Sequence, residues 1–210
     1  MIPFLETLLA LPFLAALAMV FLRGRSRGQV AWVAASAPLL GLALLAWMTP
    51  AVLQGWVPDA HHAWIPQIGL DFDLRLDGLA WMFAGLVLAI GALVVMYAHY
   101  YLSSEDSAPR FFGCLLLFMG SMLGVVIAGN LLLLMVFWEL TSISSFLLIG
   151  FWYKRQDARE GARMALAITG GGGLALLGGV LLIGRITGSY DLDVVLASGD
   201  AIRASALYPW

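Results

Sequence analysis

Long apolar stretches limit the fold of this chain more than any other feature of its sequence. A helix that crosses the hydrocarbon core of a bilayer needs about 20 predominantly apolar residues. Because hydrophobic residues make up 62% of the chain and charged residues only 11%, a single soluble core is too small to bury this surface. The sequence therefore predicts an all-α membrane protein with about six transmembrane helices, at 3–22, 30–48, 79–98, 111–129, 131–151 and 163–183.

The first apolar stretch is predicted to be a retained transmembrane helix. A signal peptide carries its positive charge before the apolar run and a small-residue cleavage site after it. Here the acid Glu6 precedes the run, and the basic sequence RGRSR follows it. The order of charges is the reverse of that in a signal peptide.

The distribution of basic residues predicts the orientation of the helices. Cytoplasmic segments of membrane proteins carry an excess of Lys and Arg. With six spans, one set of connecting segments holds eight basic residues and the other set holds three. We therefore expect a multi-pass protein of the cell membrane in which both ends of this chain are external. The richer set is Arg23, Arg25, Arg27, Arg110, Lys154, Arg155, Arg159 and Arg163, and the poorer set is Arg75, Arg185 and Arg203.

The longest connection, 49–77, shows a different periodicity. In IGLDFDLRLDG, residues 68–78, apolar residues alternate with polar ones or glycine. Alternation with a period of two is typical of a β-strand. We expect a short extramembrane strand or hairpin around 64–76, followed by Asp77 as the N-cap of the third helix.

Several classes of function lack the residues that they need. A net charge of −2 and the absence of a basic cluster with exposed aromatic residues argue against a nucleic-acid partner. His61 and His62 have no third ligand at metal spacing, and the single cysteine, Cys114, is too few for an iron–sulfur cluster. The run TGGGG, 169–173, is not followed by Lys-Ser/Thr and so is no phosphate-binding loop. We expect neither a metal site nor a cofactor in this chain.

One acid interrupts the fifth apolar stretch. Glu139 lies inside VFWELTSISSFLLIGFW, 136–152, and no other residue between Arg110 and Lys154 carries a formal charge. A charged side chain at the bilayer centre costs about 2.5–3.5 kcal/mol on insertion scales, and protonation of a carboxyl reduces that cost. Because its proton affinity then depends on hydration and nearby charge, Glu139 is the candidate proton carrier. The alternative is a permanently protonated side chain that hydrogen-bonds between helices.

Two further residues are candidates for assisting Glu139. Ser142 lies one helical turn along on the same face, where it can donate a hydrogen bond or hold a water, or else bond its own backbone. His99 lies in VVMYAHYYL, 94–102, and is a candidate relay because histidine changes charge near physiological pH; the alternative is a place in an interfacial belt of tyrosines. No basic residue lies in a predicted membrane interior, so the basic partner of Glu139 is expected from outside this chain.

The residues around Glu139 resemble a known family. Three runs are similar to the A subunit of the Mrp-type multisubunit Na+/H+ antiporters and, more distantly, to the large antiporter-like membrane subunit of respiratory complex I. They are LRLDGLAWMFAGLVLAIGALVVMYAHYY (74–101), GNLLLLMVFWELTSISSFLLIGFW (129–152) and ARMALAITGGGGLALLGGVLLIG (162–184). The resemblance implies the first two helices and an external loop over 1–60, a region like the N-terminus of complex I chain 5 over 61–110, and the start of the proton-antiporter transmembrane domain over 111–210.

The resemblance also implies a role for Glu139. It matches the family's fifth-helix glutamate, which transfers protons together with a lysine on the seventh helix. The chain stops before that helix, so we expect an N-terminal part of the Mrp-type A subunit that does not transport by itself. The implied function is exchange of Na+, or another monovalent cation, for H+ across a lipid bilayer, with the other antiporter subunits as partners. On this basis the chain is part of a transporter and not an enzyme.

Two other interpretations stay open. The first is a proton-pumping membrane subunit of a complex I-like NADH:quinone oxidoreductase or a membrane hydrogenase, whose redox cofactors would lie in partner subunits. The second is a purely structural membrane scaffold, in which Glu139 joins helices by hydrogen bonds.

Overall fold

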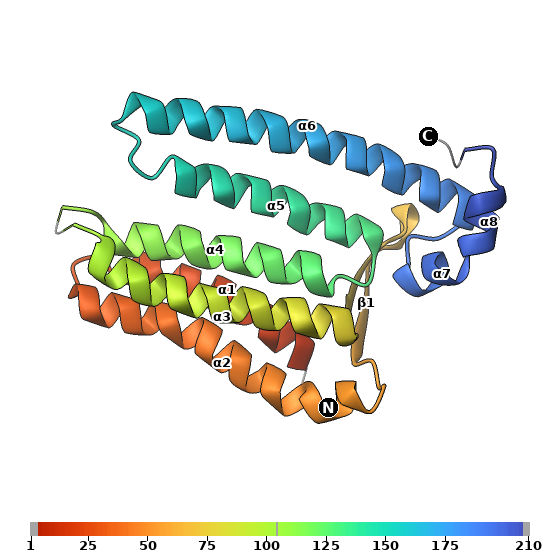
Figure 1. Cartoon of the computed structure of the whole chain (residues 1–210), viewed down its shortest axis with the longest axis horizontal. Helices are drawn as coiled ribbons and strands as arrows, with labels where there is room; N and C mark the ends of the chain where they lie inside the picture. Colours follow the sequence, from red (N-terminus) through yellow and green to blue (C-terminus); the bar gives the residue numbers. More distant parts are fainter. Residues whose placement is uncertain (1–3, 104, 208–210) are drawn as a thin grey trace.

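The structure is a computed structural model of the chain, and it describes residues 4–103 and 105–207. Its long helices run side by side (Figure 1), and six of them, α1 to α6, are long and apolar enough to cross a membrane. The prediction of an all-α membrane protein with six spans and a short hairpin is confirmed. The elements are α1 (Phe4–Phe21), α2 (Arg27–Leu53), β1 (Asp59–Ile65), the 3-10 helix η1 (Pro66–Ile68), β2 (Leu70–Arg75), α3 (Gly78–Tyr101), α4 (Ala108–Ile127), α5 (Leu131–Ile149), α6 (Gln156–Thr187), α7 (Leu192–Ala197) and α8 (Gly199–Ala204).

Two helices, α2 and α6, extend furthest beyond the apolar stretches that predicted them. α2 continues to Leu53, and α6 begins at Gln156. Hydropathy marks only the part of a helix that meets lipid, whereas polar residues at the ends continue the same backbone hydrogen bonding. α6 is helical through its glycine run, although glycine has a low helix propensity, because a backbone in lipid has to satisfy its hydrogen bonds internally.

Helices α1 to α4 form a ring of four, and α5 and α6 extend from one side of it (Figure 1). α1 and α3 each pack against both α2 and α4, while α5 packs on α4 and α6 packs on α5. Large, fully buried side chains lie in the ring, among them Leu8 of α1, Leu88 of α3, and Phe112 and Leu116 of α4. The apolar core is therefore centred on α1–α4.

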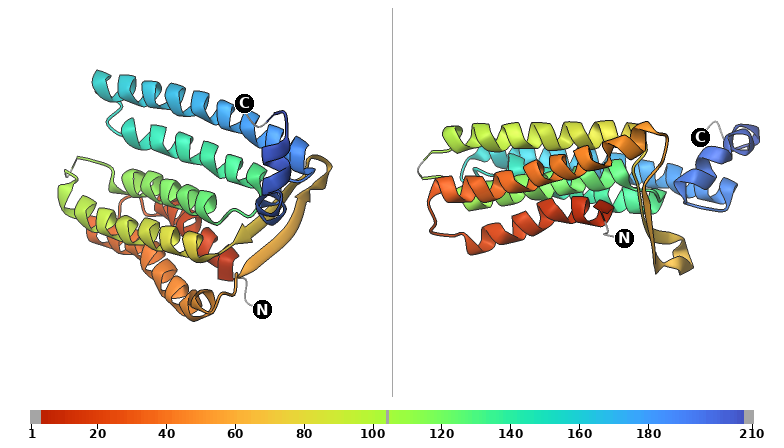
Figure 2. Two further views of the ribbon diagram at one scale, coloured as in Figure 1. Left: turned by 45° about the vertical axis from the view of Figure 1, so that its right-hand side comes forward. Right: turned by 90° about the horizontal axis from the view of Figure 1, so that it is seen from below.

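The hairpin lies at one end of the helices, next to α7 and α8 (Figure 2). β1 and β2 pair antiparallel, with Ala60 opposite Leu74, and Gly69 takes the left-handed conformation, φ 75°, that closes the turn. The first strand begins earlier than the predicted 64–76, at Asp59. Most side chains of β1 are exposed, so backbone pairing to β2 holds it in place, and no alternating burial marks it in the sequence.

The turn between α4 and α5 is held between two distant segments. The Gly129 N–H donates to the Asp73 carbonyl of β2 at 2.8 Å. On the other side, Leu192 N–H donates to the Gly129 carbonyl and Leu131 N–H donates to the Tyr190 carbonyl, each at 2.8 Å. The hairpin, this turn and the segment after α6 therefore form one hydrogen-bonded junction.

Polar side chains cap the helices that leave this junction. Asn130 is buried, and its Oδ1 accepts from the N–H groups of Leu132 and Leu133 at 2.9 and 3.2 Å. Asp77 Oδ1 accepts from Ala80 N–H at 2.8 Å, which confirms the predicted N-cap of α3. Each cap satisfies backbone donors that a helix leaves free at its start.

The alternating direction of the helices gathers the basic residues at the end opposite the hairpin. The connections α1–α2, α3–α4 and α5–α6 all lie at that end (Figure 1), and they and the adjoining helix turns hold the eight basic residues of the richer set. Arg75, Arg185 and Arg203 lie at the hairpin end. We call these the basic end and the hairpin end.

Candidate functional site

Glu139 lies near the middle of α5, on the side where α5 packs against α6. Its side chain is partly buried, and its Oε1 lies so close to Gly173 that a methyl group at position 173 would overlap it. Gly173 is one of three buried residues of α6, with Ala162 and Val180, so this face of α6 is turned toward α5. The absence of a side chain at 173 leaves the space that the carboxyl occupies.

The other glycines of the run do not share this position. A Cβ added at Gly170, Gly171 or Gly172 would meet nothing within 4 Å, whereas one at Gly173 would meet the Glu139 carboxyl and Trp138. The sequence shows a glycine run in the next helix but does not say which glycine faces Glu139. Gly173 is thus a residue of the candidate site that sequence reasoning missed.

The hydroxyl groups beside Glu139 bond to their own helix. Ser142 is buried, and its Oγ donates to the Trp138 carbonyl at 3.3 Å. Thr141 Oγ1 donates in the same way to the Phe137 carbonyl at 2.9 Å. Ser142 therefore lies within one turn of Glu139 without donating to it here, and its supporting role stays a prediction.

Positive charge is distant from Glu139 along the helices. Within residues 4–103 and 105–207, every Lys and Arg of the spanning helices lies near a helix end. On α6, the helix that faces Glu139, the basic residues are Arg159 and Arg163 near its start and Arg185 in its last turn. A positive partner for the carboxyl would have to come from outside the described chain.

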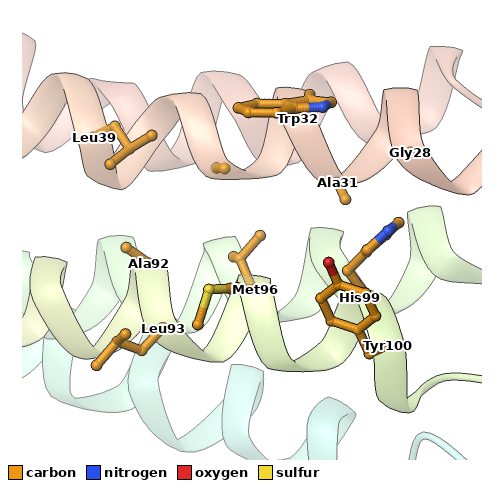
Figure 3. A pocket seen from close by; sticks show the side chains of 11 residues that line it. Gly28, Ala31, Trp32, Leu39, Ala92, Leu93, Met96, His99 and Tyr100 are labelled. Atoms are coloured by element: carbon orange, nitrogen blue, oxygen red, sulfur yellow. The ribbon is translucent and has the colours of Figure 1, made fainter.

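His99 lies elsewhere in the fold. It belongs to α3, and α4 packs between α3 and α5. It lines a groove of about 410 Å³ between α2 and α3; Figure 3 shows its ring pointing toward α2, near Gly28 and Ala31. Its Nδ1 is buried without a hydrogen-bond partner among the described residues, and the Tyr100 ring packs edge-on at 4.9 Å. The structure does not bring His99 and Glu139 together, so the relay stays a prediction without geometric support.

The hairpin end holds a polar cleft of about 550 Å³. Burial raises the pKa of the Asp73 carboxyl above its ordinary 3.8, although a hydrogen bond with His61 acts in the opposite direction. Arg75 Nη1 lies 2.5 Å from Asp193 Oδ1, an ion-pair distance. No three His, Cys, Asp or Glu side chains of the described residues are placed to hold a metal ion. We interpret the cleft as an ionic cluster that joins the hairpin to the segment after α6.

Two protein families match the chain in separate regions. The family described as "NADH-Ubiquinone oxidoreductase (complex I), chain 5 N-terminus" matches residues 64–112. The family described as "NADH:quinone oxidoreductase/Mrp antiporter, TM" matches residues 128–206, which include α5 and α6.

Curated relatives match nearly the whole chain. A protein of Rhizobium meliloti (strain 1021), named as the A/B subunit of a probable K(+)/H(+) antiporter, is 53% identical over 204 residues, which are 97% of this chain and 20% of the relative. A Staphylococcus aureus protein, named as the A1 subunit of a Na(+)/H(+) antiporter, is 40% identical over 199 residues, 94% of this chain and 25% of the relative. This chain spans a fifth to a quarter of the length of these two relatives.

Solved structures share the fold. A chain of the Mrp complex from Dietzia sp. DQ12-45-1b superimposes with a TM-score of 0.84 at 30% identity, over 97% of this chain and 22% of that chain. A chain of the membrane-bound sulfane sulfur reductase, an archaeal respiratory membrane complex, superimposes with a TM-score of 0.74 at 18% identity, over 95% of this chain and 32% of that chain. The second likeness shows a common fold only.

Proposed function

The chain belongs to the NADH:quinone oxidoreductase/Mrp antiporter family, in which it matches the N-terminal part of the Mrp-type A subunit, and from this membership we propose that it is a membrane subunit of a multisubunit monovalent cation/proton antiporter. The cation is Na+ or K+, the two ions in the names of the relatives. Its partners are the other antiporter subunits, and it lies in the cell membrane with its basic end toward the cytoplasm.

We infer that Glu139 is the proton carrier, and the observation behind this is the place of its carboxyl between α5 and α6. A carboxyl can hold a proton as the neutral acid and release it as the carboxylate, so carboxyl groups inside membrane spans can serve in proton relays. A positive charge that arrives within about 4–6 Å favours the ionised form and expels the proton. When that charge leaves, the carboxyl takes up a proton again. Proton and cation thus compete for one site, which is the condition that exchange requires.

The test is Glu139→Gln in the assembled antiporter, reconstituted in vesicles with a pH-sensitive dye. Glutamine keeps the size and polarity of the side chain but cannot exchange a proton, so cation-driven proton movement should fall to the background of empty vesicles. Glu160→Gln is the matched control, since Glu160 is exposed on α6 and bonds only Gln156 (2.7 Å) among the described residues. Normal exchange in Glu139→Gln would contradict the proposal and favour the scaffold interpretation.

The second candidate is a proton-pumping component of a redox assembly, which the descriptions of both matching families favour because both include an oxidoreductase. The two candidates differ in their source of energy. An imposed Na+ or K+ gradient alone should move protons in the antiporter. Proton movement that needs a reduced electron donor and a quinone would favour the redox assembly.

A further inference from the structure

A surface groove runs between α1 and α4, away from the proposed proton path. Its volume is about 480 Å³, within the range of about 300–1,000 Å³ that is typical of ligand sites. Its walls are mainly apolar and include Leu17 and Val20 of α1 and Gly113 and Cys114 of α4. Leu17 and Val20 are 58% and 53% exposed, so the groove opens on a surface of two membrane-spanning helices. An occupant of the groove would be in contact with the hydrocarbon of the bilayer.

Two arginines lie at the basic end of this groove. Arg23 and Arg110 both line it, and neither has a carboxylate at ion-pair distance among the described residues. The Arg110 guanidinium packs over the Tyr153 ring at 4.8 Å and the Phe151 ring at 5.3 Å. This stacking restricts the planar group, which can then present its donors to an anion in a fixed orientation. The groove thus combines a long apolar wall with two arginines at one end, of which Arg110 also borders a neighbouring cleft that holds Glu105 and Asp106.

We propose that the groove binds an anionic glycerophospholipid, with one acyl chain along α1 and α4 and the phosphate between Arg23 and Arg110. Guanidinium groups recognise phosphate oxygens through paired, charge-assisted hydrogen bonds. Basic pockets between transmembrane helices on the cytoplasmic side are suited to anionic lipid headgroups. The lipid would belong to the leaflet at the basic end.

The groove between α2 and α3 lacks this pattern. It is of similar size, about 410 Å³, but its lining holds no Lys or Arg (Figure 3). Its polar side chains, His99 and Tyr100, offer no permanent charge to a phosphate. Selectivity for an anionic headgroup is therefore expected from the α1–α4 groove.

The first experiment is native mass spectrometry of the full chain, released from detergent with equal amounts of phosphatidylglycerol and phosphatidylcholine. We expect the wild type to retain phosphatidylglycerol about tenfold more than phosphatidylcholine, the order expected when two arginines contact one anionic headgroup. Arg23→Gln with Arg110→Gln should abolish this preference. Arg25→Gln with Arg163→Gln, which removes the same charge from the same end but outside the groove, should keep it. Equal loss in both double variants would mean general charge attraction and would overturn the proposal.

The second experiment uses the single cysteine of the chain, which lines the groove, and needs no arginine substitution. A benzophenone attached to Cys114 in membranes of the assembled complex should, on illumination, add the mass of one phosphatidylglycerol. Gly113→Leu, whose side chain would fill the groove near Met19 (3.6 Å from an added Cβ), should reduce that product in a chain labelled at the same position. A cross-link to a polypeptide in place of lipid would show that a protein covers the groove and would overturn the proposal.

Discussion

The α1–α4 ring and the α5–α6 pair are built in different ways. In the ring, the buried share of an apolar 18-residue window is 39% in α1 and α2, 28% in α3 and 56% in α4, whereas in the pair it is 28% in α5 and 11% in α6. The ring is filled by large side chains such as Phe112 and Leu116. The buried residues of α6 are smaller, Ala162, Gly173 and Val180. The ring is held by its own packing, and α6, the outer helix of the pair, has most of its surface free for lipid or other subunits.

The proposed proton carrier lies in the pair, outside the ring. The carboxyl proposed to carry protons lies in the loosely packed pair, where a glycine leaves space beside it. Regions with few buried contacts open and move at low cost in free energy. The ring supplies the rigid support against which α5 is packed.

The largest effect should come from matched leucine substitutions in the two regions. Leu116 of α4 is fully buried, whereas Leu174 of α6 is 73% exposed. Leu116→Ala leaves a cavity and should lower the free energy of unfolding by about 2–5 kcal/mol. Leu174→Ala should have nearly no effect, because lipid fills the space. Unfolding by sodium dodecyl sulfate in mixed micelles measures both, and equal losses would show that the two regions are equally packed.

The second prediction tests the space beside Glu139. Gly173→Ala places a methyl group on the carboxyl, so cation/proton exchange should fall about tenfold to a hundredfold, as expected when a reacting group is displaced by about 1 Å. Gly172→Ala is the matched control. Its methyl group meets nothing within 4 Å, so it should leave exchange unchanged and stabilise the helix by about 0.5–1 kcal/mol. The same exchange rate in both variants would refute a role for Gly173.

The smallest expected effect concerns how the free energy of unfolding depends on pH. It involves one carboxyl at each end of the bundle, where the ring is joined to the pair. At the basic end, Asp106 accepts from Trp152 Nε1 at 2.9 Å. Burial alone would raise the pKa of Asp106, but hydrogen bonds from Ser103 and Trp152 outweigh it, and the pKa lies below 3.8. At the hairpin end, the pKa of Asp73 lies above 3.8 because of burial. Above pH 3.8 the ionised Asp106 therefore increases the free energy of unfolding, and this contribution is lost as the pH falls through its lowered pKa. Asp73 has the opposite effect, because the free energy of unfolding decreases as the pH rises through its raised pKa.

Two variants measure these opposite slopes. Asp106→Asn should reduce stability by at most about 1 kcal/mol at neutral pH, and the reduction should disappear in acid. The stability of Asp73→Asn relative to the wild type should instead improve as the pH rises. Unfolding midpoints from pH 3 to pH 8 give both slopes, and slopes of the same sign would contradict the assignment of the two environments.

The six helices can be predicted because a bilayer makes apolar length nearly sufficient for a helix. Glu139 can be found because it is isolated in an apolar run. Gly173 cannot be identified from the sequence, because the face that α6 turns toward α5 depends on how the two helices pack and not on either sequence alone. β1 can be predicted only in part, because backbone pairing with β2 holds this strand in place while most of its side chains stay exposed, so its sequence shows no alternation of apolar and polar residues. In the sequence, Arg23 and Arg110 indicate only orientation, and their common groove exists only once α1 and α4 are packed together.

The junction at the hairpin end has a mechanical consequence for the candidate site. α5 and α6 are joined at one end by the short 150–155 connection and at the other by the backbone hydrogen bond from Leu131 to Tyr190. Because α5 and α6 are joined at both ends, the distance between them can change only if one or both helices bend in between. The glycines of 170–173 lie in that interval, and glycine resists bending least. The part of the pair that bends most easily is therefore at the depth of the Glu139 carboxyl, so the two helices can separate there while both ends stay joined.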